Sequence, residues 1–201
     1  MEKYKSGYFF SPEFVGDNSW NGYEHNVLFE CHEGPGRFIE AGRALGCDGV
    51  EDGRGVAVAD LNSDGLLDIV INNNNGPPSL VINHVEDAGN WLQIRLVGGD
   101  RCNRDAIGAR VEVLINASGT EQRLTRWVEA GSGYASQSDG RLHFGLGEAT
   151  QIESLQITWP DGERQDLDPE LLTSLVNELV VIRQGADPVS MRPSPDRSDA
   201  R

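Results

Sequence analysis

The sequence predicts an all-β protein whose second half is a β-sandwich. From residue 91 to residue 183, short runs rich in β-branched and aromatic residues alternate with turn residues, which is typical of many short strands. Further upstream, apolar runs of strand length flank a loop of oxygen-bearing side chains at residues 60–68. No apolar run approaches the ~20 residues that a membrane-spanning helix needs. These observations predict a chain built from strands, with a candidate cation site in one hairpin.

The loop at residues 60–68, called here the acidic loop, has the spacing of a calcium site. Side-chain oxygens stand at loop positions 1, 3, 5 and 9, and Gly65 stands at position 6. Ca²⁺ takes 6–8 oxygen ligands, and a glycine at position 6 permits the sharp turn because it adopts positive φ freely. The alternative is a polar turn that holds no metal. We predict Ca²⁺ as the cofactor, with these donors: Asp60, Asn62, Asp64, the carbonyl of Leu66, and Asp68.

The flanks of the acidic loop argue against an EF-hand. An EF-hand places helices on both sides and a bidentate glutamate at position 12. Here residues 55–59 and 69–71 are short apolar runs, and position 12 is Ile71. A dockerin-type loop would also continue into a helix. The acidic loop is therefore predicted to be the turn of a β-hairpin.

Composition limits the partners and leaves the redox state open. The chain has 201 residues and a net charge of −15, with its basic residues scattered, so nucleic acid and anionic membranes are poor partners. The three cysteines, Cys31, Cys47 and Cys102, form no CxxC motif. A Cys31–Cys47 disulfide and three unpaired thiols both remain possible. The first residues lack the apolar core of a signal peptide.

We predict a first strand-rich region over residues 1–84, a sandwich over 90–184 and a disordered tail over 185–201, where prolines stand among charges. Phe29, Trp20 and Tyr23 in the first region are expected to be core residues. A short helix should begin with Asp168 as its N-cap and Pro169 at its first position. The expected strands of the sandwich are 91–97, 109–115, 120–129, 141–144, 154–159, 164–167 and 178–183.

Residues 53–68 resemble an FG-GAP (VCBS-type) repeat. The segments 103–111, 131–138, 143–147 and 159–162 resemble the ASPIC/UnbV domain, so the chain looks like the cartilage acidic protein/UnbV-like family. The resemblance implies that residues 1–84 are part of an integrin-like β-propeller, with calcium in the hairpin. It also implies an extracellular or periplasmic location. Because a complete propeller needs at least four blades, we expect a C-terminal fragment that continues upstream into further blades.

The leading functional hypothesis is a non-enzymatic, calcium-stabilised, secreted binding or adhesion module for a protein or carbohydrate ligand. One alternative, implied by the resemblance, is an accessory protein of enediyne-like biosynthesis. Another is a hydrolase that uses the polar loops of residues 100–140, although no nucleophile elbow, HExxH or phosphate loop is present. Polar side chains in loops 100–105 and 131–139 are candidates for a ligand site or for turn residues that satisfy the backbone. They are Asn103, Arg104, Asp105, Ser132, Tyr134, Ser136, Gln137 and Ser138, whereas His143 is expected to be structural.

Overall fold

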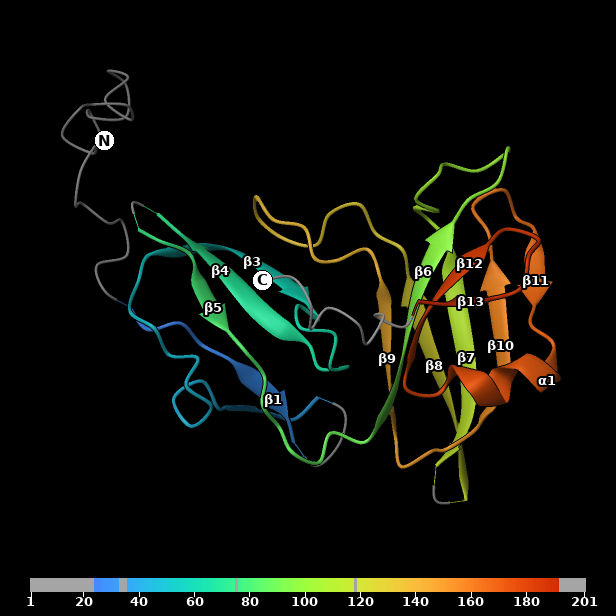
Figure 1. Cartoon of the computed structure of the whole chain (residues 1–201). Helices are drawn as coiled ribbons and strands as arrows, with labels where there is room; N and C mark the ends of the chain where they lie inside the picture. Colours follow the sequence, from blue (N-terminus) through green and yellow to red (C-terminus); the bar gives the residue numbers. More distant parts are fainter. Residues whose placement is uncertain (1–23, 33–35, 75, 118, 192–201) are drawn as a thin grey trace, which may run out of the picture. The chain divides into compact units, whose positions relative to one another are not determined.

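The computed structural model describes residues 24–32, 36–74, 76–117 and 119–191 (Figure 1). Their regular secondary structure is almost entirely strand, in four sheets, with one short α-helix and one 3-10 turn, which confirms the predicted all-β class. The described part of the chain contains no helix that is long and apolar enough to cross a membrane. The chain divides into two compact units. Of the described residues, the first unit includes those up to Val58, Asp68–Ile82 and Gly133–Ser136, and the second includes Ala59–Leu67, Asn83–Ser132 and those from Gln137.

The first unit contains two small sheets. Strand β1 (Phe29–Cys31) pairs antiparallel with β2 (Phe38–Glu40). Strands β3 (Gly53–Ala59), β4 (Asp68–Asn73) and β5 (Ser79–Val81) form a three-stranded sheet in that order. The acidic loop thus connects two neighbouring strands, as the hairpin prediction requires.

Few apolar side chains of the first unit are buried. Ala41 and Ile71 are its buried hydrophobic residues among those described, whereas Phe29 is 60% exposed and Phe38 is 63% exposed. The expectation that Phe29 is a core residue is therefore wrong, because β1 belongs to a two-stranded sheet that leaves this ring open to solvent. Trp20 and Tyr23 lie outside the described residues. In the described part of the chain, Cys31, Cys47 and Cys102 form no disulfide.

The second unit is a sandwich of two four-stranded sheets (Figure 1). In one sheet the order is β13-β12-β6-β9, with β6 parallel to β12 and antiparallel to β9. In the other the order is β11-β10-β7-β8, and every pair is antiparallel. The strands are β6 (Asn90–Val97), β7 (Arg110–Ala117), β8 (Thr120–Trp127), β9 (Leu142–Gly147), β10 (Ile152–Thr158), β11 (Arg164–Asp166), β12 (Glu178–Arg183) and β13 (Val189–Ser190).

Alternation of side chains along these strands creates the core. In β7, for example, Val111, Val113 and Ile115 are buried while the residues between them are more exposed, as expected when one face of a strand packs inward. A single apolar cluster includes residues from both sheets, among them Leu92, Ile94, Phe144, Leu155 and Trp159. The sandwich therefore has a continuous core of its own.

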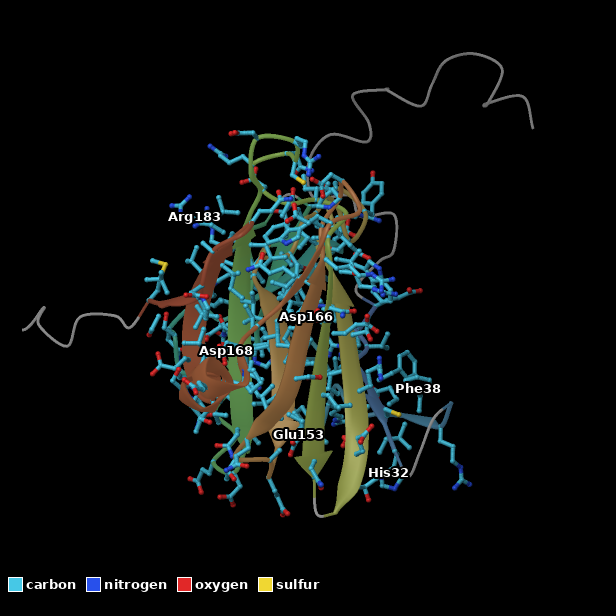
Figure 2. The ribbon with its side chains drawn as sticks, turned by 90° about the vertical axis from the view of Figure 1, so that its right-hand side faces the viewer. His32, Phe38, Glu153, Asp166, Asp168 and Arg183 are labelled. Carbon is cyan, nitrogen blue, oxygen red and sulfur yellow. The ribbon has the colours of Figure 1, made fainter. Side chains whose placement is uncertain are left out.

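The connections follow the chemistry of their turn residues. Gly162, in the turn between β10 and β11, has a φ of 88°. Helix α1 (Pro169–Leu172) begins as predicted after Asp168, which is labelled in Figure 2. Asp168 Oδ1 accepts the backbone N–H of Glu170 at 2.9 Å. A 3-10 turn, η4 (Thr173–Leu175), follows directly. Hydrogen bonds from the Glu163 backbone and the Gln184 side chain hold the pKa of Asp161 below its usual value.

The C-terminal segment differs from the predicted disorder over residues 185–191. Here β13 pairs antiparallel with β12, and Ser190 Oγ donates to Glu178 Oε2 at 2.5 Å. The pairing satisfies backbone groups along β12 that would otherwise form an open sheet edge. Two residues of strand are too short a signal to stand out among prolines and charges. Residues 192–201 lie outside the described part of the chain.

Replacing Phe144 by alanine should strongly destabilise the sandwich. Its ring is fully buried in the core, and large-to-small changes of this kind cost about 3–5 kcal/mol. Chemical denaturation followed by circular dichroism would measure the loss. Tyr134→Ala is the control, because that ring is 78% exposed and should change stability by less than about 0.5 kcal/mol. Equal losses in the two variants would contradict the placement of the core.

Candidate metal-binding loop

The acidic loop starts where β3 ends, and its residues up to Leu67 cluster with the sandwich. Asp60 is only 3% exposed, while Asn62, Ser63 and Asp64 are exposed. Ser63 and Gly65 have φ values of 61° and 88°, so the chain turns sharply at the position where the calcium spacing places a glycine. Asp68, the last predicted donor, is the first residue of β4, is fully buried and belongs to the first unit.

Hydrogen bonds within the loop turn its alternate side chains inward. Asp60 Oδ1 accepts the N–H of Asp64 at 3.2 Å, and Asp60 Oδ2 accepts the N–H of Gly65 at 3.0 Å. Asp64 Oδ1 accepts the N–H of Leu66 at 2.8 Å. Asn62 Nδ2 donates to Asp64 Oδ2 at 2.7 Å. The side chains at positions 1, 3 and 5 therefore bond to the backbone of their own turn or to one another.

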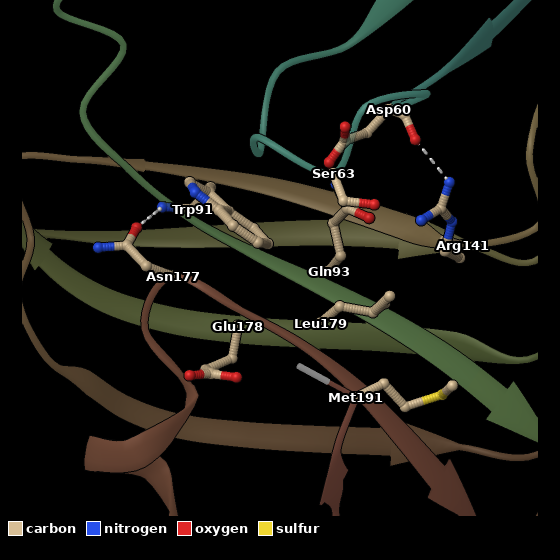
Figure 3. A pocket seen from close by; sticks show the side chains of 9 residues that line it. All are labelled: Asp60, Ser63, Trp91, Gln93, Arg141, Asn177, Glu178, Leu179 and Met191. Atoms are coloured by element: carbon tan, nitrogen blue, oxygen red, sulfur yellow. Dashed lines mark hydrogen bonds between the residues drawn. The ribbon is translucent and has the colours of Figure 1, made fainter. Parts of the chain in front are cut away.

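Three side chains from the sandwich also hold the loop. Gln93 on β6 donates from Nε2 to Asp60 Oδ2 at 2.6 Å. Arg141, just before β9, donates from Nη2 to the carbonyl of Asp60 at 2.9 Å (Figure 3). On β9, the His143 Nε2 lies 2.8 Å from the carbonyl of Gly65, and an N–H at this nitrogen donates to it. The acidic loop is thus bonded to the sheet at positions 1 and 6.

The three contacts come from one face of the sheet. Gln93 and His143 are direct cross-strand partners, and Arg141 stands two residues before His143. Residues at this spacing share a face, while their neighbours Leu92, Leu142 and Phe144 point into the core. The loop accordingly lies on the outer face of the sheet.

Sequence reasoning did not identify these three residues as partners of the loop. They stand 33 to 81 positions away in the chain, and no local pattern joins them. One available signal was Gln93 itself, a polar residue two positions after Trp91 in a strand-forming segment.

Trp91 packs against the turn of the loop. A Cβ atom built on Gly65 would lie only 2.1 Å from Trp91 Nε1, so the indole occupies the space that any side chain at position 65 would need. Gly65 is therefore required for two reasons, its positive φ and this close approach. The backbone N–H of Trp91 donates to Asn177 Oδ1 at 3.0 Å, which ties the strand carrying the indole to the segment before β12 (Figure 3).

A cavity of about 430 Å³ lies next to the loop on the sandwich side. Asp60 and Ser63 line it together with Trp91, Gln93 and Arg141 (Figure 3). A second cavity of about 300 Å³, lined by Gly65 and Leu66, shares Trp91 as a wall. Space for water and small ions therefore borders the loop at both position 1 and position 6.

The donor set suits a hard cation in its chemistry. All five predicted donors are oxygens, which Ca²⁺ and Mg²⁺ prefer. In the described part of the chain, no three His, Cys, Asp or Glu side chains are gathered as a metal site. The carboxylate of Asp64 instead bonds to Asn62 and to the N–H of Leu66, both within the loop. Because Asn62 and Asp64 are exposed, their side chains have room to rotate toward an ion.

Five of the other predicted candidates form bonds within their own loops. Asn103 accepts the N–H of Ile107 at 2.7 Å and donates to its carbonyl at 2.9 Å. Arg104 pairs with the adjacent Asp105 in solvent. Ser132 Oγ accepts the N–H of Ser138 at 3.0 Å. These contacts are those of turn residues that satisfy nearby polar groups, the second of the two interpretations offered from sequence.

Substituting Gly65 by alanine should destabilise the chain more than the same change at Gly162. Both glycines have a φ of 88°, so both variants carry the left-handed backbone cost of about 1–2 kcal/mol. Only the Cβ at position 65 would meet the Trp91 indole, whereas nothing lies within 4 Å of a Cβ at position 162. Urea denaturation of the two variants would measure the difference, and equal losses would show that the indole does not pack there.

Comparison with known proteins identifies two regions. Residues 53–90 match the FG-GAP repeat, and residues 99–187 match the family described as ASPIC and UnbV. Cartilage acidic protein 1 of Xenopus tropicalis is 34% identical over 117 residues, which cover 56% of this chain and 17% of that protein. The Mus musculus and Homo sapiens proteins of that name are each 33% identical over 114 residues, covering 55% of this chain. The match spans only about a sixth of the length of these relatives (17% and 16% for the last two). The predicted resemblance is confirmed: the segment that matches the FG-GAP repeat includes the acidic loop, and the segment that matches the ASPIC and UnbV family forms most of the sandwich.

Proposed function

We propose that this chain is a non-enzymatic binding module of extracellular type whose acidic loop is stabilised by Ca²⁺. The observation that carries the calcium assignment is the oxygen-only spacing of the loop, combined with a buried Asp60 at position 1 and a positive-φ glycine at position 6. The FG-GAP match and the relatives named cartilage acidic protein support an extracellular module. An adhesion role and a protein or carbohydrate ligand remain part of the proposal.

The ion would act by neutralising charge within a short stretch of chain. Asp60, Asp64 and Asp68 fall within nine residues, and two of them are buried. A buried carboxylate is costly unless hydrogen bonds or a cation stabilise it. Among the described side chains, the one bonded to the carboxylate of Asp60 is the neutral amide of Gln93, so its charge is solvated by dipoles. Ca²⁺ held by Asp60, Asn62, Asp64, the Leu66 carbonyl and Asp68 would supply the missing positive charge.

The first unit would serve as a blade that packs against further repeats. FG-GAP repeats form propeller blades, and a blade alone buries little apolar surface. Phe38, Leu80 and Val56 are large apolar side chains on three of its strands, and each is at least 49% exposed. We propose that such side chains face neighbouring repeats in the natural protein, where their burial would contribute about 25 cal/mol per Å².

Calcium should raise the melting temperature of the chain. Sites of this class bind with a Kd on the order of 10⁻⁴–10⁻³ M. Calcium at about 10 mM would then stabilise the folded state by about 1.4–2.7 kcal/mol, a shift of several degrees. Differential scanning calorimetry with calcium and then with EDTA would measure it.

Asp60→Asn keeps the shape of the side chain and should abolish the calcium-dependent shift, since it removes one ligand charge. Asp105→Asn, in an exposed ion pair outside the loop, is the matched control and should retain the full shift. A wild-type melting temperature that changes with neither calcium nor EDTA would refute the calcium assignment. Turnover of ester or glycoside substrates by the pure chain would refute the proposal that the chain is not an enzyme.

Phe38→Ser tests the open apolar surface of the first unit. Because the ring is 63% exposed, the change should alter stability by less than about 0.5 kcal/mol while lowering the fluorescence of a bound hydrophobic dye. Thermal unfolding and dye titration at equal protein concentration would give the two readouts. A large loss of stability would mean that the ring is already packed and that this surface is not available to another repeat.

A further inference from the structure

We propose that β6 and β9 of the sandwich act as the supporting shell of the calcium site, with Gln93, Arg141 and His143 as positioning residues that set its affinity. This inference rests on the proposed calcium binding and extends it to residues outside the acidic loop. None of the three is a predicted ligand. Their contacts fix the atoms from which the ligands project.

Gln93 is the strongest of the three observations. It lies on the outer face of β6 and yet is only 2% exposed, and its side chain bonds to Asp60 of the acidic loop. A buried amide needs hydrogen-bond partners, and Gln93 Nε2 finds one in Asp60 Oδ2 at 2.6 Å. A hydrogen bond to an ionised group is stronger than a neutral one. The loop and the strand therefore satisfy each other's buried polar groups.

This bond also decides which oxygen of Asp60 faces the ion. Asp60 Oδ2 accepts two hydrogen bonds, from Gln93 Nε2 and from the N–H of Gly65. Asp60 Oδ1 accepts one longer bond, from the N–H of Asp64 at 3.2 Å. An ionised carboxylate offers about two acceptor sites on each oxygen, so Oδ1 is the atom with capacity left for a cation. Gln93 thereby assigns Oδ1 as the metal-facing oxygen.

Arg141 and His143 hold the loop at its backbone. Arg141 bonds to the carbonyl of Asp60 and is itself oriented by an ion pair with Asp139. His143 bonds to the carbonyl of Gly65, whose Cα lies against the Trp91 indole. Positions 1 and 6 of the loop are therefore fixed on the sheet, while the donors at positions 3 and 5 stay exposed.

Such an arrangement lowers the ordering cost of binding. Ligands that are already oriented lose less conformational entropy when the ion arrives. Residues that orient metal ligands through hydrogen bonds commonly change metal affinity by 10- to 100-fold when they are removed. By thermodynamic reciprocity, an ion that binds better when the loop is held by the sheet must in turn strengthen that hold.

The test is Gln93→Met in the whole chain, with Gln156→Met as the matched control. Gln156 on the other sheet makes the same type of bond, from its Nε2 to Asp166 Oδ1 at 2.7 Å, but does not touch the loop. We expect calorimetric titration with CaCl₂ to give a Kd about tenfold weaker for Gln93→Met and unchanged for Gln156→Met. In calcium-free buffer, hydrogen exchange at the amides of Asp64 and Gly65 should be faster in Gln93→Met alone.

The outcomes separate this inference from the function on which it rests. A wild-type chain that binds no Ca²⁺ overturns the calcium assignment and the supporting shell together. If the wild-type chain binds Ca²⁺ and Gln93→Met binds it equally well, only the proposal of a supporting shell is overturned. Circular dichroism would confirm that each variant is folded. If Gln93→Met is not folded, Arg141→Met replaces it, because that side chain is 21% exposed, and the same two readouts apply.

Discussion

The buried carboxylate of Asp60 is the constraint from which the rest of the site follows. At 3% exposure it has little contact with bulk water, so the protein must supply most of the stabilisation of its negative charge. Two N–H groups of its own loop and the amide of Gln93 do this. The first two require the sharp turn at Gly65, and the third requires a glutamine on the outer face of β6. Stabilising the carboxylate of Asp60 therefore contributes both to the conformation of the loop and to its position on the sandwich.

The two units differ in how they obtain their stability. The sandwich buries a continuous cluster between its sheets, and its strands alternate inward and outward residues as independent domains do. The described residues of the first unit bury Ala41 and Ile71 while leaving large apolar side chains open. A unit with so little buried apolar surface gains little from the hydrophobic effect alone. The sandwich therefore has the core of an independent domain, whereas the first unit resembles one repeat of a repeat protein, which is stabilised by its neighbours.

Local chemistry explains what could be predicted from the sequence. The alternation of residues 91–97 and 178–183 located β6 and β12 to within one residue, and the turn chemistry of Asp168 located α1. The side-chain contacts of Gln93, Arg141 and His143 with the loop could not be found, because only tertiary folding brings those segments together. Phe29 was misassigned since strand propensity does not reveal whether a strand's face is covered. The strand β13 was missed because its pairing depends on the edge of β12 rather than on its own composition.

The position of the acidic loop on the sheet affects how tightly its donors would bind an ion. Oxygen donors spaced over nine residues specify which kind of ion can bind. The affinity of the loop for that ion depends on how much conformational entropy the donors lose when the ion binds. Here the sheet fixes positions 1 and 6, and the exposed donors at positions 3 and 5 would be left to close around the proposed ion. The same spacing on a free loop would have to order all of its donors at once. The residues that distinguish one loop of this kind from another are therefore to be sought on the surface beneath it, at the positions equivalent to Gln93, Arg141 and His143, as well as within the spacing itself.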